Sequence, residues 1–130
     1  MNRWLAAALV LGLGIPVQVA GQEEREEANK RLVRAFVQAI NDRDFDALDD
    51  LVAEDLVRHS PSTPGLIVRS REDFKAFLRE DVAAVPDSKQ TIRMMVAEGD
   101  MVAGWNTYAG TQTGAMGPYP PSGKRVELDF

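Results

Sequence analysis

The chain has 130 residues, enough for about one domain, and its 45% share of hydrophobic residues is ordinary for a globular protein. Its formal net charge of −5 and its lack of any Lys/Arg cluster argue against a nucleic-acid-binding surface. The absence of Cys excludes disulfides, thiol nucleophiles and thiolate metal sites, and the single His excludes a multi-His metal site.

The first 21 residues have the pattern of a secretory signal peptide. A short basic start is followed at 4–17 by an uncharged, almost wholly apolar run, which is shorter than the roughly 20 residues that a membrane span needs. Val19-Ala20-Gly21 predicts cleavage before Gln22, although an uncleaved anchor or a buried helix remains an alternative. We therefore expect a signal peptide over 1–21 and a secreted or periplasmic mature domain over 22–130, with no membrane attachment after cleavage.

Three helices are predicted in the first part of the mature chain. Residues 28–40 place their apolar side chains on one helical face, and a shorter helix follows at 45–52 with Asp44 as its N-cap. A third helix is expected to begin after Ser70, because Ser70 and Asp73 have the spacing of a capping box. Between the second and third helices, a short strand is predicted at 55–59, followed by a loop rich in Pro.

The later part of the chain is predicted to form strands. Residues 91–114 indicate a hairpin that turns at 98–100, where Gly99 can adopt the positive φ of a tight reversal. Ile92, Met94 and Val96 alternate with other residues, which predicts one buried strand face. After a Pro/Gly loop, alternating apolar residues at 123–130 begin another strand. Helices followed by antiparallel strands predict an α+β fold with helices on one side of a curved sheet.

Several local patterns occur in an order that is similar to a known family. They are the helix-turn run at 36–48, His-Ser-Pro at 59–61, the run at 74–87, Glu-Gly-Asp-Met-Val-Ala at 98–103, Gly-Thr-Gln-Thr-Gly at 110–114 and Pro-Pro-Ser-Gly-Lys-Arg-Val at 120–126. In this order the chain resembles the SnoaL-like polyketide cyclase, or ester cyclase, branch of the nuclear-transport-factor-two-like superfamily. The resemblance implies a cone-shaped curved antiparallel sheet covered by three N-terminal helices, with a ligand pocket between them, and a homodimer.

The chain departs from the family pattern at two places. Members often carry His within the Gly-Thr-x-Thr-Gly motif, where this chain has Gln112. In characterised cyclases of the branch, an Asp that acts as acid and base lies on the strands that end the domain, and that segment would follow Phe130. We therefore expect the SnoaL-like domain at 22–130 to lack its last strands, and the catalytic Asp cannot be carried over to any residue here.

The candidate catalytic residues are His59 and Gln112. His59 is the only side chain whose ordinary pKa lies near neutrality, and it precedes a loop that could border a pocket. The alternative is a His bonded to loop backbone without a chemical role. Gln112 can donate and accept hydrogen bonds, so it could hold a substrate carbonyl or satisfy backbone at the edge of the sheet.

The candidate substrate-binding residues are Trp105, Asn106 and Tyr108. Because neighbouring strand residues point to opposite faces, only one of the two aromatic side chains should face the pocket unless a bulge intervenes. Tyr108 shares its face with Gly104, Asn106 and Gln112, and this is the preferred lining because small neighbours leave room for a ligand. Either aromatic side chain could instead be an ordinary core residue.

These observations predict an exported protein that binds a small hydrophobic or carbonyl-containing ligand. If it is active, the expected reaction is acid/base chemistry of a cyclase or isomerase on an enolisable carbonyl compound, with no cofactor and no metal. The alternative is a non-catalytic module on the same fold that binds a ligand or forms dimers.

Overall fold

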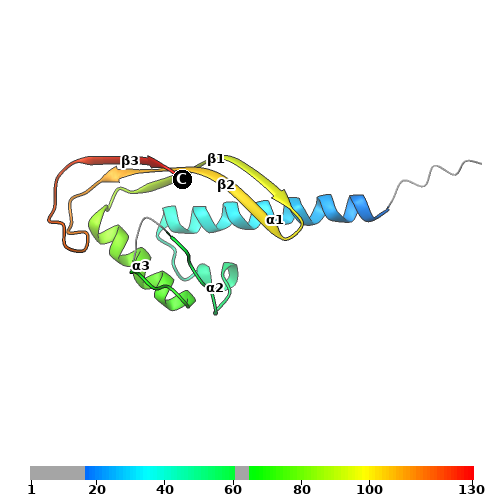
Figure 1. The fold of residues 1–130 in the computed structure, drawn as a ribbon, viewed down its shortest axis with the longest axis horizontal. Helices are drawn as coiled ribbons and strands as arrows, with labels where there is room; N and C mark the ends of the chain where they lie inside the picture. The colour runs from blue at the N-terminus through cyan, green and yellow to red at the C-terminus, as the bar shows by residue number, and fades with distance from the viewer. Residues whose placement is uncertain (1–16, 61–64) are drawn as a thin grey trace, which may run out of the picture.

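The computed structural model describes residues 17–60 and 65–130, which form three helices followed by three strands (Figure 1). The helices are α1 (Val17–Asp42), α2 (Leu48–Leu51) and α3 (Arg71–Ala84), and the strands are β1 (Lys89–Glu98), β2 (Met101–Thr111) and β3 (Arg125–Asp129). The strands form one antiparallel sheet in the order β1-β2-β3, and all the helices lie on the same side of it. This is the predicted α+β architecture of helices covering one face of a curved sheet.

Helix α1 is longer than the sequence pattern predicted. It begins at Val17 rather than near residue 28, so it continues through the predicted cleavage position. The acidic segment at its start consists of good helix formers, and Gln22 donates a hydrogen bond to Glu26 four residues later. The helix ends at Asp42 because Arg43 has a φ of 62°, which reverses the chain.

Two predicted elements are shorter in the structure. The second helix is limited to Leu48–Leu51, because Asp44 accepts a hydrogen bond from the Ala47 N–H and so supports the turn that precedes the helix. The strand predicted at 55–59 is wrong as a strand, since only Arg58 forms a bridge, to Val68.

The start of α3 agrees with the capping prediction. Ser70 is the N-cap, and its Oγ accepts a hydrogen bond of 3.0 Å from the Asp73 N–H. The Asp73 carboxylate reaches back to the Arg69 N–H at 3.2 Å. These two contacts fix where α3 begins and therefore how its later turns meet the sheet.

The main hydrophobic core lies among the three helices. Leu48 from α2 and Val68 are almost fully buried, and they pack with Phe74 of α3 and Ile40 of α1. The rings of Phe36 and Phe74 stack at 5.8 Å between centroids, which joins α1 to α3. Because this core lies among the helices, on one side of the sheet, it does not cover the opposite face of the sheet.

The hairpin turn is confirmed, whereas the predicted buried face of β1 is wrong in part. Gly99 has a φ of 58° between the paired Glu98 and Met101. The register shifts between Ile92 and Met94, so one extra residue, Arg93, enters β1 as a bulge. The bulge reverses the alternation, which leaves Met94 and Val96 exposed and turns the odd-numbered residues beyond it toward α1.

Side chains of α1 hold both ends of β1. The Asn41 amide exchanges two hydrogen bonds of 2.8 Å with the backbone of Gln90. At the other end, Glu26 accepts a hydrogen bond from the Gly99 N–H, and Asn29 donates one to the Gly99 carbonyl. These hydrogen bonds therefore hold α1 and the hairpin together at both ends of their common length.

Candidate functional site

The most distinctive polar contact on the helix-facing side of the sheet joins Tyr108 of β2 to Asp81 of α3. The Tyr108 hydroxyl donates to the two carboxylate oxygens of Asp81, at 3.1 and 3.2 Å. Both side chains are partly buried between helix and sheet. A carboxylate and a phenol brought together in this way are two groups that can accept and donate protons.

The surroundings shift the pKa of both groups in the direction that favours their neutral forms. Burial raises the pKa of Asp81 above its ordinary value of 3.8, and the hydrogen bond from Tyr108 partly opposes this rise. Burial and the nearby Asp81 charge raise the pKa of Tyr108 to about 12. Near neutral pH, Tyr108 is therefore a hydrogen-bond donor, and Asp81 is a stronger base than an exposed carboxylate.

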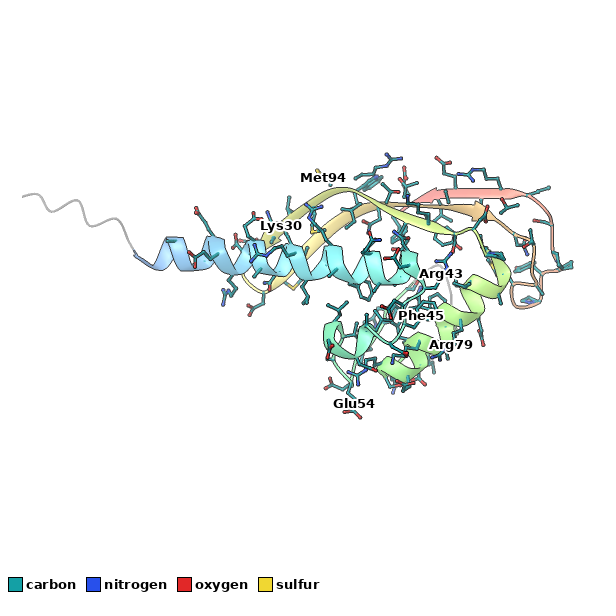
Figure 2. The ribbon with its side chains drawn as sticks, turned by 180° about the vertical axis from the view of Figure 1, so that it is seen from behind. Lys30, Arg43, Phe45, Glu54, Arg79 and Met94 are labelled. Carbon is teal, nitrogen blue, oxygen red and sulfur yellow. The ribbon has the colours of Figure 1, made fainter. Side chains whose placement is uncertain are left out.

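Two arginines provide positive charge beside this pair, and both lower the pKa of Asp81. Arg43 lies at the end of α1 (Figure 2), and it donates to the Ile40 and Pro86 carbonyls and to the backbone and hydroxyl of Ser88. Arg58 lies over the ring of Phe77, 4.4 Å from its centroid. These contacts hold the arginines in place, so they can stabilise negative charge that develops near Asp81.

An apolar surface borders the pair on β3. Leu128 is paired with Tyr108, and Phe130 exchanges backbone hydrogen bonds with Asn106, so their side chains share the helix-facing side with those residues. Both apolar side chains are about half exposed. Polar groups beside exposed apolar side chains are the usual composition of a small-molecule site.

The Gly-Thr-Gln-Thr-Gly motif connects β2 to the end of α3. The N–H groups of Thr113 and Gly114 both donate to the Ala84 carbonyl, and the Asp87 carboxylate accepts from the backbone and hydroxyl of Thr111. A methyl group at Gly114 would overlap the Ala83 carbonyl. The motif thus fixes the C-terminal end of α3, from which Asp81 projects.

The side-chain amide of Gln112 is hydrogen-bonded within its own loop. Its amide nitrogen donates to the carbonyls of Gly114 and Pro120, and its oxygen accepts a hydrogen bond of 2.7 Å from Ser122. This arrangement matches the alternative in which Gln112 satisfies backbone at the edge of the sheet. Its catalytic role stays a prediction that no contact in the structure supports.

The other predicted site residues are divided between the two sides of the sheet. Tyr108 and Asn106 lie on the helix-facing side, whereas Trp105 is exposed on the opposite, outer face, so only one of the two aromatic side chains faces the helices. His59 is exposed one residue after Arg58. Because successive side chains in an extended segment point in opposite directions, the contact of Arg58 with Phe77 turns His59 away from the pair.

The sequence reasoning missed Asp81, Arg43 and Arg58. The sequence pattern singled out none of these three residues as a candidate for a site. The available signal was that Asp81 is three residues after Leu78, a core residue of the same helix, which places it at the edge of the buried face.

A depression elsewhere on the molecule is unrelated to this pair. It has a volume of about 520 Å³ and lies at the hairpin tip beside the start of α1, lined by Gln22, Glu26, Val96, Ala97, Glu98, Met101 and Ala103. Across 17–60 and 65–130, no group of three or more Asp, Glu, His or Cys side chains has an arrangement that could hold a metal ion. Within those same ranges, none of the helices combines the length and apolar character of a membrane span.

Comparison with known proteins identifies relatives of the same fold. TsrD from Streptomyces laurentii is 30% identical with a TM-score of 0.66, over 77% of this chain and 72% of TsrD. A SnoaL-like polyketide cyclase from Agrobacterium tumefaciens is 19% identical with a TM-score of 0.63, over 78% of this chain and 75% of that one. An LEH-like epoxide hydrolase from M. tuberculosis is 23% identical with a TM-score of 0.62, over 81% and 70%. The last two likenesses concern the fold alone.

The sequence itself carries the family signature. No curated protein sequence matches the chain. Residues 30–130, however, match the profile of the SnoaL-like polyketide cyclases, and this match covers the second half of α1, the other two helices, the sheet and the Gly-Thr-Gln-Thr-Gly motif. The chain therefore belongs to the SnoaL-like polyketide cyclase family and has its nuclear-transport-factor-two-like fold.

Proposed function

We propose that this protein binds a small carbonyl-containing molecule between α3 and the sheet and catalyses acid/base chemistry on it without a cofactor. The observation that carries the proposal is the hydrogen-bonded pair of Asp81 and Tyr108 beside the half-exposed Leu128 and Phe130. The family match supports the same class of ligand, because its members are described as polyketide cyclases, whose substrates are rich in carbonyl groups.

In this reaction Asp81 removes a proton from the carbon next to the substrate carbonyl. The electron pair of the broken C–H bond moves toward the carbonyl oxygen and forms an enolate, and the proton remains on Asp81. Tyr108, whose pKa of about 12 keeps it protonated, donates a hydrogen bond to the enolate oxygen, and the Arg43 and Arg58 charges stabilise the anion. Return of the proton from Asp81 to the same carbon gives hydrogen exchange, and its delivery to a different carbon of the conjugated enolate completes an isomerisation.

The test is deuterium incorporation next to the carbonyl of aryl ketones and β-keto esters in D₂O, measured by NMR against the spontaneous rate. We expect Asp81→Asn to lower the enzyme-catalysed rate by at least about 100-fold, the lower range of general-base contributions. Glu80→Gln is the matched control, because Glu80 is the exposed neighbour of Asp81 on α3. Exchange at the wild-type rate in Asp81→Asn would remove Asp81 from the mechanism.

The pH dependence gives a second readout. Asp81 acts as a base only when it is deprotonated, so the rate should rise as the pH passes through the pKa of Asp81, which lies above the ordinary 3.8. His59→Ala should leave this profile unchanged, because His59 is exposed and turned away from the pair. A profile that His59→Ala abolishes would restore the original assignment of His59 as the acid/base group.

A second candidate is a ligand-binding module without turnover. The engagement of the Gln112 amide within its own loop favours this alternative, since one predicted catalytic group is then unavailable to a substrate. In that case β-keto esters would bind with similar affinity to the wild type and to Asp81→Asn, as titration calorimetry would measure, and neither would catalyse exchange.

We also propose that the protein forms a homodimer. The support is the number of large apolar side chains exposed on the sheet, among them Met94, Met101 and Trp105. Sedimentation equilibrium should give a mass of twice the monomer at micromolar concentration, and a monomer throughout the micromolar range would overturn the proposal.

Export is proposed from the leader pattern at 1–21. Among the contacts described for α1, the first side-chain hydrogen bond is donated by Gln22, so cleavage before this residue would leave the contacts of Glu26 and Asn29 with the hairpin intact. Intact mass spectrometry of the protein recovered from a bacterial periplasm should show a chain that begins at Gln22. A cytoplasmic chain that still carries 1–21 would contradict export.

A further inference from the structure

Helix α1 ends in a backbone conformation that favours glycine, although the residue there is Arg43. The N–H groups of Arg43 and Asp44 donate to carbonyls in the last turn of α1, in the hydrogen-bond pattern of a Schellman motif. The φ of Arg43 is 62°, and across 17–60 and 65–130 every other residue with a positive φ is a glycine. Because a side chain strains the backbone in this region, the contacts of the Arg43 side chain must offset that cost.

The Arg43 guanidinium binds the segment that leads from α3 to β1. Its Nη2 donates to the carbonyls of Pro86 and Ser88, at 3.0 and 2.7 Å, and to the Ser88 hydroxyl at 3.0 Å. Ser88 is only 6% exposed, which protects these bonds from water. Because the Ser88 Oγ accepts a hydrogen bond from Arg43, its own hydrogen is directed toward another group.

Strand pairing places Ser88 beside Tyr108. Tyr108 is paired with Gln90, and Ser88 comes two residues before Gln90, so Ser88 and Tyr108 are diagonal neighbours on the helix-facing side of the sheet. Burial and the Asp81 charge raise the pKa of Tyr108 to about 12, and a hydrogen bond with the Ser88 side chain partly opposes this rise. Because this bond favours the charged form of the phenol, Ser88 is its donor and Tyr108 its acceptor.

These contacts form a chain of hydrogen bonds with a fixed direction. Arg43 has no acceptor, so it can only donate to Ser88, and the Ser88 hydroxyl then donates to the Tyr108 oxygen. The Tyr108 hydroxyl is left to donate to the two Asp81 oxygens, at 3.1 and 3.2 Å. Each bond in such a chain polarises the next one, so Tyr108 is a better donor than it would be without Ser88.

We propose that Arg43 and Ser88 are positioning residues that orient the Tyr108 hydroxyl during the reaction. This inference rests on the proposed function, in which Tyr108 donates a hydrogen bond to the enolate oxygen. When Asp81 takes the substrate proton, it loses its charge and becomes a weaker acceptor. The Tyr108 proton then turns to the enolate oxygen, while the Tyr108 oxygen stays hydrogen-bonded to Ser88. Ser88 thus acts through Tyr108, and Arg43 acts through Ser88 in addition to its charge.

Ser88→Ala in the full chain tests the middle of this chain of hydrogen bonds. The substitution removes a single oxygen atom and adds no bulk, so the fold should be retained. Without the Ser88 donor, Tyr108 stabilises the Asp81 carboxylate less, so the pKa of Asp81 should rise, by less than in Tyr108→Phe. Titration of the Asp81 carboxyl carbon by NMR measures this change without substrate. A Ser88 with only a structural role would leave the pKa of Asp81 unchanged, and that result would overturn the proposal.

The exchange assay in D₂O gives the kinetic readout. Ser88→Ala should lower kcat by about tenfold, less than the roughly 100-fold loss that follows removal of a donor in direct contact with the anion. KM should change by less than about twofold, because Ser88 does not touch the bound substrate. Thr91→Val is the matched control, since it removes an exposed hydroxyl from the same strand, and it should leave kcat, KM and the pKa of Asp81 at their wild-type values.

Arg43→Lys tests the start of the chain. Lysine keeps the positive charge and the same backbone strain, but it lacks the planar fork that holds the Ser88 hydroxyl and the neighbouring carbonyls together. We expect Arg43→Lys to lower kcat about as much as Ser88→Ala, and the double variant to be within about threefold of either single variant, because both changes break one chain. Losses that multiply in the double variant would show that Arg43 does not act through Ser88.

The two readouts separate this inference from the proposed function on which it rests. A wild type that catalyses exchange, together with a Ser88→Ala variant of equal kcat, would leave the proposed function standing and overturn the positioning role. A wild type without exchange activity would overturn the proposed function and with it the role in the reaction, whereas the Asp81 titration would still decide whether Ser88 acts on Tyr108.

Discussion

At the scale of single residues, the informative contact is the hydrogen bond from the Tyr108 hydroxyl to the partly buried Asp81 carboxylate. Asp81 has a raised pKa because burial disfavours its charged form, and the Tyr108 hydroxyl recovers part of that cost. Burial of the charged Asp81 carboxylate lowers the stability of the folded protein, and the same burial makes Asp81 a stronger base.

Asp81→Asn should stabilise the folded protein near neutral pH. The pKa of Asp81 is higher in the folded than in the unfolded state, so its contribution to stability is complete only below the unfolded pKa of about 3.9 and is lost as the pH rises through the folded pKa. Asparagine does not titrate, so the variant should melt a few degrees higher at pH 7, and this difference should vanish toward pH 3. Thermal unfolding across this pH range measures it, and a lower melting temperature at pH 7 would contradict the reasoning.

Tyr108→Phe should raise the pKa of Asp81 further. The hydroxyl stabilises the carboxylate by donating a hydrogen bond to it, and phenylalanine keeps the ring without this donor. Titration of the Asp81 carboxyl carbon by NMR should show the increase. Tyr119→Phe is the control, because Tyr119 is exposed and makes no side-chain contact with Asp81; an equal shift in both variants would point to a nonspecific cause.

At the scale of elements, the close approach of β2 to the end of α3 sets the position of the candidate site. The Gly-Thr-Gln-Thr-Gly motif wraps the last turn of α3, and its glycines leave no space for a side chain. A methyl group at Gly110 would overlap Val85 and would lie 2.9 Å from the Ser88 Cα. Packing against the end of α3 therefore requires glycine at Gly110 and Gly114.

Gly110→Ala should destabilise the protein by about 1–3 kcal/mol, the usual cost of overpacking a close contact. Gly104→Ala, in the same strand, is the matched control, because its new methyl group would find its nearest neighbours at 3.7 Å. It should be neutral or slightly stabilising, since alanine reduces the entropy of the unfolded chain. Denaturant unfolding compares the two variants, and equal midpoints would show that the strand can move away from α3.

At the scale of the whole molecule, one face of the sheet holds the candidate site and the other is available for association. The helix-facing side has Asp81, Tyr108 and Asn106, and the outer face has Trp105 and Met94. The proposed reaction and the proposed self-association can therefore be tested separately by substitutions on opposite faces of the same strands.

Self-association should change the fluorescence of Trp105. Trp105 is 52% exposed in the single chain, so a partner on the outer face would move it into a drier environment. In a chain that begins at Gln22, Trp105 is the only Trp, and the emission maximum should shift to shorter wavelength as the protein concentration rises through the dissociation constant. Met94→Lys should delay that shift to higher concentration, and an emission maximum independent of concentration while the mass doubles would place the interface away from Trp105.

The sequence by itself determined the features that depend on neighbouring residues. Gly99 predicted the hairpin turn, the Ser70 hydroxyl predicted the start of α3, and the order of helices and strands predicted the α+β fold and its family. The turn and the cap each depend on a few neighbouring residues, where backbone sterics and capping act, and the fold and family follow from the order of such local patterns along the chain.

Only the tertiary structure decided which side chains meet. The bulge at Arg93 reversed the faces of β1, and a contact over 27 positions in the sequence brought Asp81 to Tyr108. In the folded chain the Gln112 amide is hydrogen-bonded within its own loop, and His59 is exposed. These outcomes depend on strand register and on how closely α3 approaches the sheet, which are set by packing between distant segments and leave no local pattern in the sequence.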